Sequence, residues 1–138
     1  MKLNPNKILL IDDDAISSSI NKFTVSSTGL FNDVIIKSTG KDALDFLKEE
    51  ISKREDLPSI LLVDIYMPDY DGFELIDLID ELFEDNNIEL QPHLIILSDS
   101  KFIKDIEQFD KTPTIEHFLK KPLTKEVFEN TLKELKII

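Results

Sequence analysis

Short unbroken runs of aliphatic residues recur along this chain, each bounded by polar residues or turn formers. Runs of four to eight such residues predict strands that are buried on both faces, as in a parallel sheet with helices on either side. Five strands are predicted, at residues 7–11, 33–37, 60–64, 93–97 and 116–119. These strands are expected to form the centre of the fold.

Between the runs, apolar residues recur every three or four positions, which predicts helices. The helical repeats are Ile16, Ile20 and Phe23; Leu44, Leu47 and Ile51; Leu75, Ile76, Ile79, Leu82 and Phe83; Phe102, Ile103, Ile106 and Phe109; and Phe128, Leu132 and Leu135. Asp71 and Gly72 are expected to open the third helix, and Thr124 to cap the fifth, over residues 125–136. Polar loops are predicted at residues 53–59 and 85–92.

Strands that alternate with helices at this spacing predict the α/β class, with a doubly wound parallel sheet of five strands and five helices. The chain has 138 residues, with no internal repeat and no stretch that reads as a linker. We therefore expect a single domain over residues 1–138, without an output domain.

Composition excludes several classes of function. A net charge of −12, from 28 acidic and 16 basic residues, disfavours binding to nucleic acids and to anionic membranes. There is no cysteine, which excludes disulfides, thiolate metal sites and thiol nucleophiles. The first residues lack the apolar core of a secretory signal, and no apolar run approaches the ~20 residues that span a bilayer. A cytoplasmic protein is expected.

Polar side chains that can carry chemistry follow four of the predicted strands: Asp12, Asp13 and Asp14 the first, Asp64 the third, Ser98 the fourth, and Lys120, Lys121 and Pro122 the fifth. The carboxyl ends of parallel strands share one edge of the sheet, where ligands bind. Neighbouring carboxylates repel one another unless a cation neutralises them, so an acidic pocket suited to a hard divalent cation is predicted there.

This set of groups suits phosphoryl transfer to a carboxylate. A carboxylate is a known nucleophile toward phosphoryl groups, and further carboxylates can hold Mg²⁺. The metal ion and an ammonium group offset the negative charge of the transferred group, and a hydroxyl can donate a hydrogen bond to it.

With these residues the chain resembles the receiver domain of two-component response regulators, in its stand-alone, chemotaxis-type form. The resemblance rests on the acidic pair after the first strand, on Asp64 with Pro68, Asp71 and Gly72 after it, on the Ser98 hydroxyl, and on Lys121 followed by Pro122. It implies the flavodoxin-like strand order 2-1-3-4-5.

The resemblance also implies residue roles. Asp64 is the expected phosphoryl acceptor. Mg²⁺ is expected to be held by Asp13, Asp12, Asp64 and the main-chain carbonyl of Tyr66. Ser98, Lys121 and Phe118 occupy the positions of the hydroxyl, the lysine and the aromatic switch residue. The switch position holds Phe118 where the family often has a tyrosine, so no hydroxyl is available there.

As a function, the resemblance implies a phosphorylation-switched module that accepts a phosphoryl group from a histidine kinase or a histidine phosphotransfer protein. Such a module catalyses only its own phosphorylation and dephosphorylation. The signal is expected to leave by protein–protein contacts through the fourth helix, fifth strand and fifth helix, around residues 102–109 and 116–120. The cognate kinase, the downstream target and homodimer formation stay open.

Two other functions compete with this one. A phosphatase of the haloacid-dehalogenase type also uses an aspartyl nucleophile and Mg²⁺, but it needs an acid two residues later, where this chain has Tyr66. A binding module that keeps only the fold would not need the acidic pair, the acceptor, the hydroxyl and the lysine together. Of the single residues, Asp14 is expected to cap the next helix, Lys120 competes with Lys121 for the lysine position, and Phe118 could be plain core.

Overall fold

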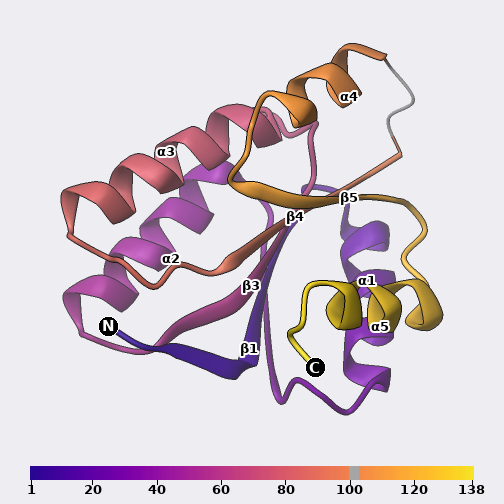
Figure 1. Ribbon diagram of the computed structural model, residues 1–138, viewed down its shortest axis with the longest axis horizontal. Helices are drawn as coiled ribbons and strands as arrows, with labels where there is room; N and C mark the ends of the chain where they lie inside the picture. Colours follow the sequence, from indigo (N-terminus) through magenta and orange to yellow (C-terminus); the bar gives the residue numbers. More distant parts are fainter. Residues whose placement is uncertain (100–102) are drawn as a thin grey trace.

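The computed structural model describes residues 1–99 and 103–138 (Figure 1). The elements run in the order β1 (Leu3–Ile11), α1 (Ala15–Ser27), β2 (Asp33–Lys37), α2 (Gly40–Ser52), β3 (Leu57–Val63), α3 (Gly72–Asp85), β4 (His93–Ser98), α4 (Ile103–Asp110), β5 (Ile115–Lys120) and α5 (Lys125–Glu134). All five strands are parallel neighbours in one sheet of order β2-β1-β3-β4-β5. The predicted fold class, number of elements and strand order are confirmed.

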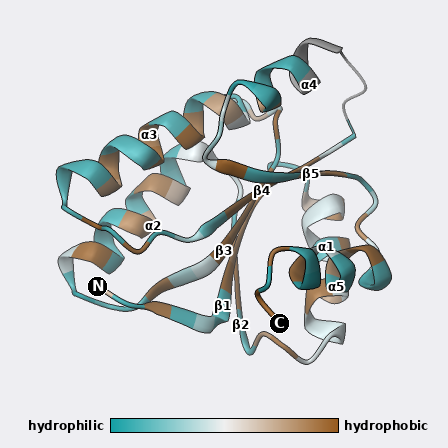
Figure 2. Cartoon of the chain, viewed as in Figure 1, coloured by the Kyte–Doolittle hydropathy of each residue, from teal (hydrophilic) through white to brown (hydrophobic). Residues whose placement is uncertain are grey.

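Helices cover both faces of this sheet, as its apolar strands require (Figures 1 and 2). Successive residues of a strand point to opposite faces, and β1 shows the consequence. Ile8 and Leu10 pack in a cluster with residues of α1 and α5. Leu9 and Ile11 pack in a second cluster with residues of α2 and α3. The sheet is therefore buried between two apolar layers, and only its edges are left to bind ligands.

The sheet begins earlier than the sequence predicted. Residues 57–59 were expected in a loop, but they form the start of β3, and β1 begins at Leu3. Leu57 is fully buried and pairs with Leu3, and Pro58 pairs with Asn4. The pairing of β3 with β4 starts only at Ile60. Pro58 therefore lies before the start of β4, so no strand on that side needs the N–H group that proline lacks.

The first helix is present as predicted, but its apolar residues point outward. Ile16, Ile20 and Phe23 are 74%, 48% and 77% exposed. The buried side of α1 carries Ser18, Asn21, Thr24 and Val25 instead. Small polar residues suit this position because their hydroxyls find backbone partners, which lowers the cost of burying them. Ser18 donates to the carbonyl of Asp12 at 3.2 Å, and Thr24 to that of Leu123 at 3.3 Å.

Three predicted helix starts are confirmed. The side chains of Asp14, Asp71 and Thr124 each accept hydrogen bonds from backbone N–H groups of the first turn, and Asp71 forms a capping box with Glu74. The fifth helix ends at Glu134, two residues before the predicted end. Phe102, predicted for the fourth helix, lies outside the described residues.

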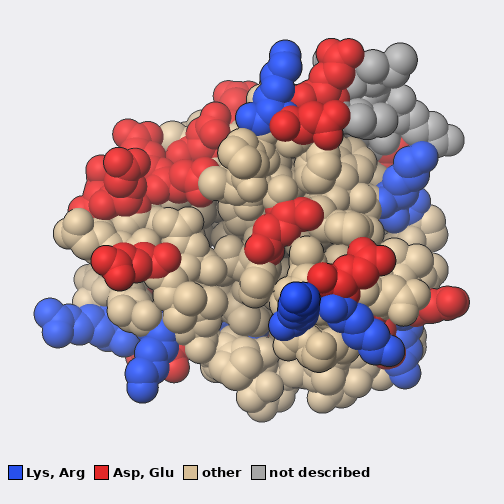
Figure 3. All heavy atoms as spheres, in the orientation of Figure 1, with Lys and Arg blue, Asp and Glu red and all other residues tan. Residues whose placement is uncertain are grey.

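Acidic side chains gather on the surface over α3, on the face that Figure 3 shows. Those that are exposed on this helix are Glu74, Asp77, Glu81, Glu84 and Asp85. These charges therefore belong to a solvated helix rather than to the predicted site. Among the described residues, no helix is both long and apolar enough to cross a bilayer.

Candidate functional site

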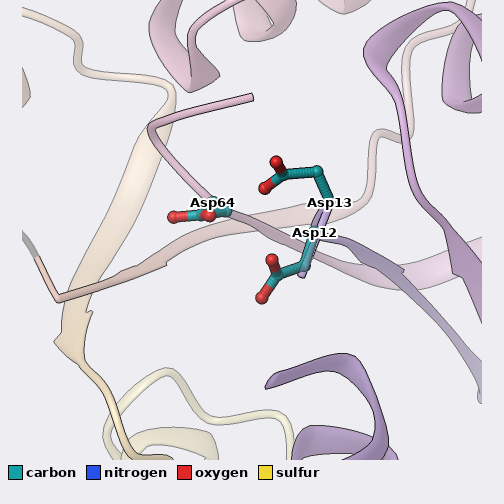
Figure 4. A group of neighbouring side chains, drawn as sticks. All are labelled: Asp12, Asp13 and Asp64. Carbon is teal, nitrogen blue, oxygen red and sulfur yellow. The ribbon is translucent and has the colours of Figure 1, made fainter. Parts of the chain in front are cut away.

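Three carboxylates converge where β1 and β3 end (Figure 4). Asp12 and Asp13 follow β1, and Asp64 follows β3, the neighbouring strand. The backbone N–H of Asp64 donates to the carbonyl of Ile11 at 2.9 Å, so the two strand ends are locked together. One carboxylate oxygen from each of the three residues lies within 4.8 Å of the others. Asp12 and Asp64 are only 4% and 7% exposed, whereas Asp13 is exposed.

Lys121 reaches into this cluster from the segment after β5. Its Nζ lies 2.7 Å from Asp12 Oδ2 and 3.4 Å from Asp64 Oδ2. Lys120 is exposed, and of the two neighbouring lysines it is Lys121 that contacts the carboxylates. The peptide bond between Lys121 and Pro122 is cis. The ammonium group thus partly neutralises the two buried carboxylates.

Asp12 has two further partners, one of which the sequence did not reveal. The hydroxyl of Ser17 donates to Asp12 Oδ2 at 2.7 Å, and the backbone N–H of Asp14 donates to Oδ1 at 3.0 Å. Ser17 belongs to the first turns of α1, five residues after Asp12. A serine at that distance is a weak signal, because serine is common at helix starts for other reasons. Ser17 and Lys121 together fix the orientation of the Asp12 carboxylate.

The carboxyl group of Asp64, the candidate acceptor, ionises less readily than that of an ordinary aspartate. Burial raises the pKa of Asp64 to about 6, and the charge of Asp12 acts in the same direction, although Lys121 works against both. Burial alone would lower the pKa of Lys121, but its contacts with Asp12 and Asp64 outweigh this and raise it. At neutral pH, Asp64 is therefore ionised and Lys121 protonated. A cation placed among these carboxylates would relieve the remaining repulsion.

The charge of ionised Asp64 is buried and repelled by Asp12, and both effects destabilise the folded state. We therefore expect Asp64→Asn to stabilise the metal-free protein at neutral pH by on the order of 1–3 kcal/mol. The pKa of Asp64 near 6 lies above its ordinary value of 3.8, so the folded state holds the proton more tightly than the unfolded state does. Ionising this group therefore costs stability as the pH rises from about 4 to about 6, and the full cost remains above that window. Thermal unfolding in EDTA across this range measures the difference.

The matched control is Asp13→Asn, which removes the same charge from an exposed carboxylate of the same cluster. Its effect should be smaller, because this carboxylate is exposed to solvent. If the difference in stability between wild type and Asp64→Asn stays constant between about pH 4 and about pH 7, the buried charge of Asp64 does not destabilise the fold.

Ser98, Tyr66 and Phe118 lie at or beyond neighbouring strand ends. Ser98 is fully buried at the end of β4, and its carbonyl accepts the backbone N–H of Lys121 at 3.0 Å. Tyr66 is exposed in the loop after β3. The half-buried ring of Phe118 packs edge-on against Phe109 of α4, with ring centres 5.8 Å apart. All three residues therefore lie where the sequence placed them, after or within the strands that end near the carboxylates.

The donor set suits Mg²⁺. This ion prefers oxygen ligands and usually keeps several waters, so it is bound through a few carboxylates rather than a closed cage. Asp12, Asp13 and Asp64 offer three carboxylates at one edge of the sheet, and Asp13 leaves the cluster open to solvent. No cysteine or histidine belongs to this group, which disfavours zinc.

Comparison with known proteins identifies the family. The model of the response regulator receiver domain matches residues 8–133, so the chain belongs to this family and is a receiver domain of a two-component system. Receiver domains are signalling modules rather than enzymes that turn over an external substrate, and they bind Mg²⁺ at an acidic pocket.

Similar structures cover nearly the whole chain. A two-component response regulator from Cytophaga hutchinsonii is 27% identical, with a TM-score of 0.82 over 99% of this chain and 98% of that one. The receiver domain of the histidine kinase CKI1 from Arabidopsis thaliana, solved with Mg²⁺, is 22% identical, with a TM-score of 0.82 over 96% of this chain and 93% of that one. At that identity the likeness to CKI1 establishes the fold alone.

Among curated proteins, the transcriptional regulatory protein CitT of Halalkalibacterium halodurans is 29% identical over 126 residues, which cover 91% of this chain and 50% of CitT. The probable C4-dicarboxylate response regulator DctR of the same organism is 29% identical over 118 residues, which cover 86% of this chain and 46% of DctR. This chain therefore spans about half the length of the curated relatives it matches.

Proposed function

We propose that residues 1–138 act as one receiver domain that is switched by phosphorylation of Asp64. The phosphoryl group comes from a histidine kinase or a histidine phosphotransfer protein, and the reaction depends on Mg²⁺. The observation that supports this is the juxtaposition of a buried carboxylate after β3 with two further carboxylates and the Lys121 ammonium.

In the proposed reaction a carboxylate oxygen of Asp64 attacks the phosphorus of a phosphohistidine. The P–N bond breaks, its electron pair returns to the imidazole nitrogen, which takes up a proton, and an acyl phosphate forms on Asp64. Lys121, already 3.4 Å from Asp64, offsets charge on the phosphoryl oxygens, and the Ser98 hydroxyl donates to one of them. Mg²⁺ bound by Asp12, Asp13, Asp64 and the carbonyl of Tyr66 would offset negative charge between nucleophile and phosphoryl group.

The phosphodonor protein is proposed to cover the exposed side of α1. Ile16 and Ile20 line a hollow of about 300 Å³ together with Lys121 and Pro122. Lys121 both lines this hollow and contacts Asp64, so a protein bound over the hollow would lie beside the acceptor. Three apolar residues of α1 point outward: Ile16, Ile20 and Phe23. Burying these side chains under a bound protein would remove apolar surface from water, which favours binding.

The signal is proposed to leave through the face formed by α4, β5 and α5. A phosphoryl group on Asp64 adds charge and acceptor oxygens beside the end of β4. Ser98 would move toward it and make room for Phe118, which now packs against Phe109 of α4. A shift of this ring would change the surface of α4 and β5 that a partner contacts. Such a shift is limited by the difference in contacts between the two states.

The competing functions lack support at particular positions. A phosphatase that uses an aspartyl nucleophile would need a general acid two residues after Asp64, and Tyr66 stands there. A module that kept only the fold would have no use for two nearly buried carboxylates held against a lysine, because burying such charges is costly.

Incubation with Mg²⁺ and a small phosphodonor such as acetyl phosphate tests the proposal. The expected result is a mass increase of one phosphate per chain, which disappears when EDTA replaces Mg²⁺. Release of many equivalents of inorganic phosphate would indicate a phosphatase. An unchanged mass, with the protein folded, would indicate a binding module and would rule out phosphoryl acceptance.

A further inference from the structure

The carboxylate of Asp69 links the loop that follows the acceptor to helix α2, which lies far from this loop in the sequence. Asp69, in the loop between β3 and α3, accepts the backbone N–H of Gly40 at 3.0 Å through Oδ1 and that of Lys41 at 2.9 Å through Oδ2. Gly40 and Lys41 are the first two residues of α2. The side chain of the N-cap residue, Thr39, accepts the backbone N–H of the third residue, Asp42, at 3.0 Å. The first N–H groups of a helix have no partner within it, so Asp69 supplies what α2 lacks.

The contact between loop and helix is close as well as polar. A Cβ atom at Gly40 would lie 2.6 Å from the ring of Tyr70, the residue after Asp69. The backbone N–H of Tyr70 also donates to Asp69 Oδ1, at 3.0 Å. Burial is the largest single influence on the pKa of Asp69 and raises it, but the N–H groups of Lys41, Gly40 and Tyr70 together outweigh burial and lower the pKa. The carboxylate is therefore charged at neutral pH and keeps three donors.

The other end of the same loop is held at the acceptor itself. The backbone N–H of Gly72 donates to the carbonyl of Ile65 at 2.6 Å. A Cβ atom at Gly72 would lie 2.6 Å from the carbonyl oxygen of Asp64, so only glycine allows this approach. Tyr66, whose carbonyl is the proposed metal ligand, lies between these two attachments. The loop can thus hold its shape before any ligand binds.

We propose that Asp69 is a positioning residue for the metal site, acting through the loop that carries Asp64 and Tyr66. This inference rests on the proposed function, because it assigns Asp69 a part in the same site. Without the bonds to Gly40 and Lys41 the loop samples more conformations, and Mg²⁺ has to order it on binding, which lowers the affinity. By linkage, Mg²⁺ binding stabilises the bonds of Asp69 to α2.

The test compares Asp69→Ala with Thr39→Ala, a matched variant that removes a capping bond from the same helix start without touching the loop. Both should lower the melting temperature. Calorimetric titration should show a loss of Mg²⁺ affinity of roughly tenfold for Asp69→Ala and little change for Thr39→Ala. Asp69→Asn, which keeps one acceptor oxygen, should lie between wild type and Asp69→Ala.

Amide hydrogen exchange gives a second measurement that needs no activity. In wild type, Mg²⁺ should slow exchange at Gly40 and Lys41, and in Asp69→Ala the amides of Tyr66 and Met67 should exchange faster. Equal Mg²⁺ affinity in Asp69→Ala and Thr39→Ala would overturn the role of Asp69 while leaving the proposed function intact. If wild type binds no Mg²⁺, the proposed function fails, and the role of Asp69 fails with it.

Discussion

Asp64→Asn is expected to abolish labelling by a small phosphodonor, with a loss of rate of at least about 10³-fold. The amide has nearly the same shape as the carboxylate, but its oxygen is a poor nucleophile, so the acyl phosphate cannot form. The side chain is only 7% exposed and sits within the cluster of carboxylates, so an isosteric change should leave the packing in place. Intact-mass measurement after incubation with the donor and Mg²⁺ reads the result directly.

Asp13→Asn is the matched control, because it makes the same chemical change in a neighbouring carboxylate that is not the acceptor. It should weaken Mg²⁺ binding and slow labelling, but the label that forms should still map to Asp64. Labelling of Asp64→Asn to the wild-type extent, at any residue, would show that the acceptor lies elsewhere. A clean loss in Asp64→Asn together with slow labelling in Asp13→Asn would separate the nucleophile from the metal ligand.

Much of this site could be predicted because it follows from strand ends. The short aliphatic runs before Asp12, Asp64 and Ser98 predict strands buried on both faces, and parallel strands bring their carboxyl ends to one edge. Adjacent residues at the end of β5 point to different sides, so Lys120 and Lys121 cannot both face the site, and the proline that follows Lys121 favours Lys121. In the structure Lys121 contacts Asp12 and Asp64.

Other features depend on contacts that no local pattern records. Helical spacing shows that Ile16, Ile20 and Phe23 share a side of α1, but not that this side faces solvent. The opposite side can be buried only because hydroxyls such as those of Ser18 and Thr24 meet backbone carbonyls brought there by the fold. The bonds of Asp69 to α2 join residues that are far apart in the sequence, and a lone aspartate in a loop gives no hint of them.

The second large effect is expected on the exposed side of α1. Replacing both Ile20 and Phe23 with alanine should lower the rate constant kcat/KM for phosphotransfer from the cognate histidine kinase by about 10²-fold, because burial of each large apolar side chain contributes ~1.5–3 kcal/mol. The kinase to use is the one that labels wild type fastest when the kinases of the source organism are profiled. Labelling by acetyl phosphate should stay at the wild-type rate, since a small donor does not need this surface.

Leu90→Ala is the matched control for this double variant. Leu90 is an apolar residue of similar exposure, 59%, but it lies in the loop before β4, at the edge of the sheet opposite the site. It should leave transfer from the kinase unchanged. An equal loss of labelling by acetyl phosphate in the double variant would mean that the phosphorylation site itself was disturbed. Unchanged transfer from the kinase to the double variant would mean that the kinase docks on another surface. If wild type sediments as a dimer that the double variant dissociates, the occupant of this side of α1 is a second copy of the chain, because the same apolar side chains cannot be buried by two partners at once.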